Sequence, residues 1–211
     1  TSSFLGLISS SLNQLGNLKQ STETLELNDA GDLILVEGDP LYPMKLSGLS
    51  EQGHLEYIKL GCVNCHTQQV RREELGKDLE RGFGQRVTVP RDYIMQANVL
   101  LGYSRIGPDL SSVGARKTDL NWHLLHLYNP QITSPSSLMP PFPFLFETVE
   151  ISETTATDNA LVFPEGNPYS PKDSIAIIPT KRAIALVEYL LNLDINYNLP
   201  EAVVTKNDTG E

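Results

Sequence analysis

The chain has 211 residues, of which 40% are hydrophobic and 20% charged, so it carries enough apolar material for one globular core. Its formal net charge of −10, from 16 Lys and Arg against 26 Asp and Glu, argues against a nucleic-acid-binding protein, which requires clustered positive charge. The chain contains 2 cysteines. This count excludes a disulfide-rich scaffold and an iron–sulfur cluster, which takes about four thiolates.

Charge is distributed unevenly along the chain. Residues 59–117 hold 10 Lys and Arg against 6 Asp and Glu, a net +4, so the remainder holds 6 against 20, a net −14. Both cysteines lie in the net-positive segment, which is compatible with an anionic group accommodated there. On charge alone, a solvated surface is the better interpretation of so small an excess.

The N-terminal residues 1–41 are predicted to form an arm. No run of about 18 apolar residues, the length needed to span a bilayer, occurs in the sequence. The nearest candidate is the apolar stretch 4–8, which lacks the basic front and the cleavage site of a secretory signal. It fits either the outer end of a membrane helix or a surface helix.

Helix signals recur along the rest of the chain. A polar cap followed by apolar residues at helical spacing predicts helices over 50–60, 119–128 and 180–193, each range beginning at its cap. A weaker pattern predicts a fourth helix over 93–101. Residues 196–211 are predicted as a C-terminal tail, disordered after Leu199.

Two long stretches between the predicted helices carry no regular pattern. Residues 129–145 contain five prolines, which exclude regular helix and central strand, and residues 146–178 mix acidic, Thr, Pro and Gly positions without a period. Such long irregular segments in a compact domain indicate a functional loop, a binding surface or a ligand that completes the core.

The most specific motif is CxxCH at residues 62–66. Two thiols one turn apart can form thioethers with the two vinyl groups of a haem, and the next imidazole then faces the iron. Cys62, Cys65 and His66 therefore predict one covalently attached haem c.

Three other interpretations of the motif were weighed. A redox-active thiol pair requires a βαβ context that the sequence does not indicate, and a structural disulfide leaves His66 unexplained. A zinc site could use the two cysteines with His123 and His126, but it also gives the histidine directly after the second cysteine no role.

Met139 is the best candidate for the second axial ligand. It precedes two prolines that stiffen an extended segment and can hold a thioether at a fixed distance from a metal. A thioether opposite an imidazole favours ferrous iron and leaves no open position, which indicates electron transfer rather than catalysis. The other candidates are Met44, Met95, His54, His123 and His126.

Further residues between the two proposed ligands are predicted to contact the haem. The Pro108 carbonyl can accept the second ring N–H of His66. Arg105, Arg116 and Trp122 are candidate donors to the haem propionates, although a turn with surface arginines explains the two arginines equally well.

These motifs together resemble a known family. The segments "YIKLGCVNCHTQQVR", "GYSRIGPDLSSVGARKTDLNWHLLHLYNP" and "SSLMPPFPFLFE", together with "ALVEYLLNL", are similar to class I mono-haem cytochromes c. They are most similar to the membrane-anchored mono-haem subunit II of cbb3-type cytochrome c oxidases. The resemblance covers residues 42–145 and the last helix.

The resemblance implies an all-α class I cytochrome c fold with long irregular loops over residues 42–195, interrupted by an insertion at 146–178. In that fold the helix bearing Gly53 and Tyr57 crosses the last helix, and the haem lies in the cleft. It implies thioether bonds at Cys62 and Cys65 and axial ligands at His66 and Met139.

The resemblance also implies a place in a respiratory complex. In this family the haem domain faces the periplasm, an N-terminal helix attaches it to the membrane, and electrons pass to the catalytic subunit. The expected partners are other subunits of that complex and another cytochrome or redox protein. The stretch after "CHTQQVR" departs from the family pattern, so a free periplasmic shuttle, a subunit of another respiratory or photosynthetic complex, and a haem enzyme or sensor with an open iron remain alternatives.

Overall fold

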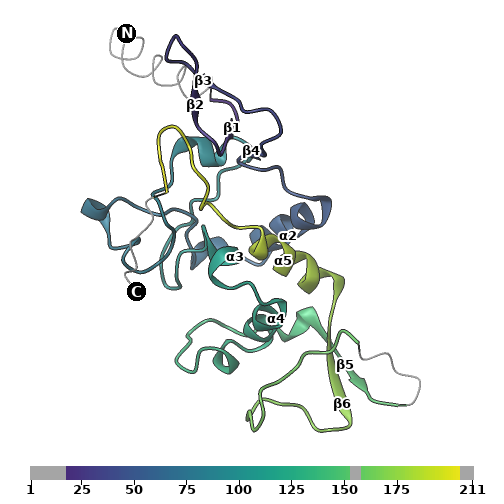
Figure 1. The fold of residues 1–211 in the computed structure, drawn as a ribbon. Coiled ribbons are helices and arrows are strands. Elements are labelled where there is room, and N and C mark those ends of the chain that lie inside the picture. The colour runs from purple at the N-terminus through teal and green to yellow at the C-terminus, as the bar shows by residue number, and fades with distance from the viewer. Residues whose placement is uncertain (1–17, 153–157, 205–211) are drawn as a thin grey trace, which may run out of the picture. The chain divides into compact units, whose positions relative to one another are not determined.

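The computed structural model describes residues 18–152 and 158–204, which divide into two compact units (Figure 1). Unit 1 consists of three stretches of chain: 18–45, 68–101 and 195–204. Unit 2 consists of the remaining described stretches: 46–67, 102–152 and 158–194. The units therefore do not follow the predicted order of arm, domain and tail. The apolar stretch 4–8 lies outside the described residues.

Unit 2 contains the helices α2 (Gly48–Lys59), α3 (Val113–Arg116), α4 (Leu120–Tyr128) and α5 (Lys181–Leu191). The caps of α4 and α5 are the predicted ones, because the Asp119 carboxylate accepts the Asn121 and Trp122 amides and the Thr180 hydroxyl accepts the Ala183 amide. α2 begins earlier than predicted, since Ser47 rather than Ser50 caps it.

Helices α2 and α5 pack together at a close crossing (Figure 1). A Cβ atom on Gly53 would lie 1.9 Å from the Ala185 carbonyl oxygen, so glycine is required at the contact. The Tyr57 ring packs edge-on against Tyr189, and the Ser50 hydroxyl donates to the Glu188 carbonyl oxygen at 3.4 Å. This crossing forms one wall of the interior of unit 2.

Two strands frame the predicted insertion. β5 (Phe146–Glu150) pairs antiparallel with β6 (Ile175–Pro179), with Phe146 opposite Pro179 and Glu150 opposite Ile175. The sequence analysis did not anticipate this ladder. The chain between the strands returns to α4, where the Asn121 side chain hydrogen-bonds both the amide and the carbonyl of Val162. The insertion thus holds the first turn of α4.

Unit 1 has little regular structure among its described residues. Its strands are short antiparallel pairs: β1 (Ser21–Thr22) with β4 (Leu41–Tyr42), and β2 (Glu26–Leu27) with β3 (Leu33–Ile34). The predicted helix over 93–101 is wrong. A single 3-10 turn covers Pro90–Tyr93, and the residues after it are turns and coil, because the pattern that suggested a helix has no cap and few helix formers.

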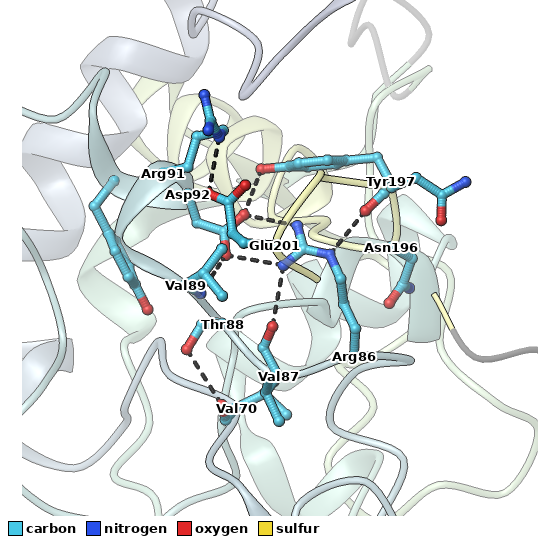
Figure 2. A network of polar contacts seen from close by, with 12 residues as sticks. Val70, Arg86, Val87, Thr88, Val89, Arg91, Asp92, Asn196, Tyr197 and Glu201 are labelled. Carbon is cyan, nitrogen blue, oxygen red and sulfur yellow. Dashed lines mark hydrogen bonds and ion pairs between the residues drawn. The ribbon is translucent and has the colours of Figure 1, made fainter. Parts of the chain in front are cut away.

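A buried polar cluster forms the interior of unit 1 (Figure 2). The Arg86 guanidinium donates to both carboxylate oxygens of Asp92, at 2.7 and 3.0 Å, and to the Tyr197 carbonyl oxygen at 2.7 Å. The Tyr197 hydroxyl donates to Asp92 at 2.9 Å. Tyr197 and Leu199 are buried, so the start of the predicted tail is part of a core rather than a loose end.

Within the described part of the chain, we find no helix both long enough and apolar enough to cross a membrane.

Candidate haem site

A cavity of about 730 Å³ lies inside unit 2. Its volume is within the range of about 300–1,000 Å³ typical of ligand and cofactor sites. Most of its wall is apolar and comes from α2, α3, α4, α5 and the 106–110 segment, including Tyr57, Leu110, Val113, Leu127, Leu186 and Leu190. The helices therefore enclose an apolar space that their own side chains do not fill.

The CxxCH motif lies at the end of α2 and lines this cavity. Gly61 adopts a left-handed conformation, with φ of 74°, which ends the helix, and a 3-10 turn over Cys62–Asn64 follows. Both cysteines are free thiols. Burial raises the pKa of Cys62 to about 11, so this thiol stays protonated at neutral pH, unlike the thiolate of a reactive redox pair.

His66 is held by a backbone carbonyl. Its Nδ1 lies 2.8 Å from the Pro108 carbonyl oxygen, and since a carbonyl can only accept, Nδ1 carries the proton. Burial lowers the pKa of His66, and the Pro108 hydrogen bond and the Asp109 charge oppose that effect. The ring is therefore neutral near pH 7, with the lone pair of Nε2 available to a metal.

Gly107 allows the His66 ring to lie against the chain. A Cβ atom on Gly107 would be 2.2 Å from Cε1 of the ring, a distance that no side chain permits. The Gly107 amide donates to the Cys65 carbonyl oxygen at 2.9 Å, which fixes this close approach. The 107–108 segment is thus shaped around the imidazole.

Met139 lines the same cavity from the proline-rich stretch. Its amide donates to the Ser137 hydroxyl at 3.2 Å, which shapes the turn that carries it. Leu138 and Ile106 also line the cavity while exposing 89% and 70% of their surface, so they mark its mouth. The structure therefore brings His66 and Met139, 73 residues apart in the sequence, to the wall of one space.

The three candidate propionate donors are placed differently. Arg116 and Trp122 line the cavity. The Arg116 guanidinium also donates to the Asp109 backbone carbonyl oxygen, and the Lys117 ammonium lies 5.0 Å from the centre of the Trp122 ring. Arg105 is not part of the cavity wall and instead forms an ion pair with Asp109 at 3.5 Å.

The two histidines of α4 have other partners. His123 Nε2 lies 2.8 Å from the Lys117 carbonyl oxygen, and His126 Nδ1 lies 2.6 Å from the Thr133 hydroxyl. Burial lowers the pKa of His126 to about 4, and its ring stacks on Trp122. In the described residues, no three His, Cys, Asp or Glu side chains form a group that could hold a metal ion. The zinc interpretation is thus not supported by the geometry.

Sequence reasoning missed two residues of the site. Asp109 is fully buried and accepts a hydrogen bond of 2.5 Å from the Thr67 hydroxyl, directly after His66. Thr133 holds His126. A signal for Asp109 was present, because a carboxylate between a turn proline and an apolar residue has little reason to be there unless it is paired.

An apolar cavity lined by the CxxCH side chains and by a distant methionine is typical of a protein that carries a haem for electron transfer. Comparison with known families agrees with this class. Residues 41–194 match the family described as "Cytochrome C oxidase, mono-heme subunit/FixO". The chain belongs to this family of mono-haem cytochrome c subunits of cbb3-type oxidases, which take part in electron transfer. A search of curated proteins found no match.

Proposed function

We propose that unit 2 binds one haem covalently through Cys62 and Cys65, with His66 and Met139 as axial ligands, and relays single electrons within its oxidase complex. The observation that carries the proposal is that all four side chains line one apolar cavity. Bound there, the haem would supply a redox-active iron that accepts and donates one electron. We also propose that unit 2 has the class I cytochrome c fold, with α2 and α5 as its crossing helices.

The residues of the cavity fit this group. The thiols of Cys62 and Cys65 are free and lie one turn apart. The neutral His66 ring is oriented by Pro108 and leaves Nε2 to bind a metal. Met139 offers a soft sulfur ligand, which raises a reduction potential relative to a second imidazole. The apolar wall excludes water, which also bears on the potential.

The cavity mouth is suited to contact with a redox partner. Leu138 and Ile106 are largely exposed, and residues 134–146 contain no charged side chain. An uncharged apolar rim allows a second protein to approach the cofactor edge without desolvating charges. We propose that another cytochrome or redox protein docks here, while the remaining surface contacts other subunits of the membrane complex on the periplasmic side.

Met139 provides the test that separates electron relay from a haem enzyme or sensor with an open iron. We expect the oxidised wild-type protein to show the weak near-infrared band of sulfur-to-iron charge transfer, and Met139→Leu to lose that band and lower the midpoint potential. Met95→Leu is the matched control, since Met95 lies in unit 1 and is partly exposed. Absence of the band from the wild-type protein, or its persistence in Met139→Leu, would contradict the proposed ligation.

Covalent attachment is tested separately by denaturation. A thioether-bound haem remains with the polypeptide in denaturant, so the unfolded wild-type protein should keep its haem absorbance after gel filtration. Cys62→Ala with Cys65→Ala should lose it. A colourless wild-type polypeptide would exclude the thioethers. Recovery of the native protein from membranes together with partner subunits would favour the complex over a free shuttle.

A further inference from the structure

A short clamp joins the ligand histidine to the segment that orients it. Residues 65–67 and 107–110, both in unit 2, are connected by four hydrogen bonds, and we call this pair of segments the ligand clamp. Its bonds are Gly107 amide to Cys65 carbonyl (2.9 Å), His66 Nδ1 to Pro108 carbonyl (2.8 Å), Thr67 hydroxyl to Asp109 carboxylate (2.5 Å) and Leu110 amide to Thr67 carbonyl (2.8 Å).

Asp109 is the charged member of the clamp. Its relative exposure is 0%, and its two carboxylate oxygens accept from different partners: Oδ2 from the Thr67 hydroxyl and Oδ1 from the Ser111 amide at 2.9 Å. The nearest guanidinium nitrogen of Arg105 lies 3.5 Å from Oδ2. This distance is longer than the 2.7–2.9 Å of a strong charge-assisted hydrogen bond, so the arginine offsets the carboxylate charge without a close contact.

The position of this charge matters because Asp109 directly follows Pro108, whose carbonyl accepts the His66 proton. A carboxylate taken out of water acts over several ångströms with far less screening than one on the surface. A fixed negative charge beside an axial ligand favours the oxidised, more positive state of the metal. Tension on the Pro108 carbonyl acts in the same direction, since a stronger hydrogen bond to Nδ1 makes the imidazole a more basic ligand.

We propose that Asp109 is a positioning residue for His66 that also lowers the reduction potential of the centre, with Arg105 as the counter-charge that limits this effect. The inference rests on the proposed ligation by His66. Asp109 holds the Pro108 carbonyl in place through Thr67, and its charge acts on the ligand from the side opposite the metal. Arg105, which does not line the cavity, acts through Asp109.

The test uses substitutions that change charge in opposite directions. Asp109→Asn keeps the size and one acceptor oxygen but removes the charge, so the midpoint potential of the haem-loaded protein should rise. Arg105→Gln removes the counter-charge, so the potential should fall. Glu147→Gln is the matched control, because Glu147 is an exposed carboxylate on β5 of the same unit, and it should leave the potential unchanged.

A second measurement separates position from charge. Thr67→Val removes the hydroxyl that joins the clamp but keeps the Asp109 carboxylate. In the reduced protein, the His66 Nδ1 proton should exchange with solvent faster in both Thr67→Val and Asp109→Asn than in the wild type, as followed by NMR. A conserved exchange rate in both variants would show that Asp109 does not position the ring.

The outcomes distinguish this inference from the proposed function. If Asp109→Asn and Arg105→Gln shift the potential in the same direction, or neither shifts it, while the near-infrared band persists, Asp109 has no tuning role although His66 and Met139 remain ligands. If Asp109→Asn does not fold, Arg105→Gln alone decides, and a potential at or above the wild-type value overturns the inference. A wild-type protein without the band instead contradicts the ligation itself.

Discussion

Unit 2 builds its interior from helix faces, whereas unit 1 builds its interior from a buried ion pair. In unit 2, Gly53 of α2 lies against the backbone of Ala185 in α5, and Tyr57 packs on Tyr189. In unit 1, Arg86 and Asp92 take the corresponding central position, with Tyr197 closing the cluster. The described strands of unit 1 are two residues long and supply few backbone hydrogen bonds.

The difference teaches how irregular chain can be kept in place. Arg86 has five donor hydrogens in a rigid fork, and it uses them on Asp92 and on the carbonyls of Val87 and Tyr197, so it ties stretches 111 residues apart in the sequence. Unit 2 instead encloses a large cavity, and a group that fills it would complete its core. One unit is completed by its own polar side chains, the other by a cofactor.

The largest effect is expected from Arg86→Met in unit 1. Removing one partner of a buried ion pair leaves the Asp92 charge without compensation, so the free energy of unfolding should fall by about 3–5 kcal/mol. Amide hydrogen exchange measures this unit by unit, and residues 68–101 should lose protection while α5 keeps it. Arg91→Gln is the control, since its ion pair with Glu201 is partly exposed and should contribute less than about 1 kcal/mol.

Equal loss of protection in α5 and in residues 68–101 would break the comparison, because the two interiors would then be one cooperative core. A small effect of Arg86→Met, similar to that of Arg91→Gln, would show that the buried cluster is not what stabilises unit 1.

Local signals in the sequence predicted much of unit 2 and little of unit 1. The start of α4 depends on Asp119 and its end on Asn129 and Pro130, all adjacent in the sequence, so the helix could be predicted residue by residue. The Arg86 cluster could not be predicted, because Arg86 and Tyr197 are 111 residues apart and nothing near either residue marks the pairing. Strands β5 and β6 were missed for the same reason, since a ladder across 24 intervening residues has no local pattern.

The candidate site shows the same division. The CxxCH motif and the proline-rich methionine could be found in the sequence because spacing and neighbours define them. The role of Asp109 could not, since it depends on Thr67, 42 residues away in the chain. Arg105 was expected at the propionates because its charge was known and its partner was not. In the structure it pairs with Asp109.

A medium effect is expected from Gly53→Ala in unit 2. The added methyl group would overlap the Ala185 carbonyl, and α2 and α5 would have to separate, so the free energy of unfolding should fall by about 1–3 kcal/mol or more. Gly48→Ala is the matched control in the same helix, because a Cβ atom there meets nothing within 4 Å, and its effect should stay within about 0.5 kcal/mol. Chemical denaturation followed by helical circular dichroism measures both. Equal effects at the two glycines would show that the close crossing is not what holds α2 on α5.

The smallest effect, and the one that depends on pH, is expected from Tyr197→Phe. The hydroxyl donates to the Asp92 carboxylate, so its removal should lower the free energy of unfolding by about 1–2 kcal/mol at neutral pH. Burial first, and then the Asp92 charge, raise the pKa of Tyr197 above its ordinary value of about 10. The folded state therefore keeps a proton that the unfolded state releases, and the stability that this tyrosine contributes is complete below pH 10 and declines as the pH rises further.

The wild-type advantage over Tyr197→Phe should consequently be constant from neutral pH to about pH 9 and shrink above about pH 10. Urea unfolding of both proteins at a series of pH values measures it. Tyr103→Phe is the control, because Tyr103 in unit 2 exposes 84% of its surface and should show no such trend. An advantage that grows with pH would mean that the Tyr197 phenol ionises more readily in the folded protein than in the unfolded chain. The interior of unit 1 would then be open to water, and the contrast with the enclosed interior of unit 2 would rest on exposure rather than on the chemistry of the buried side chains.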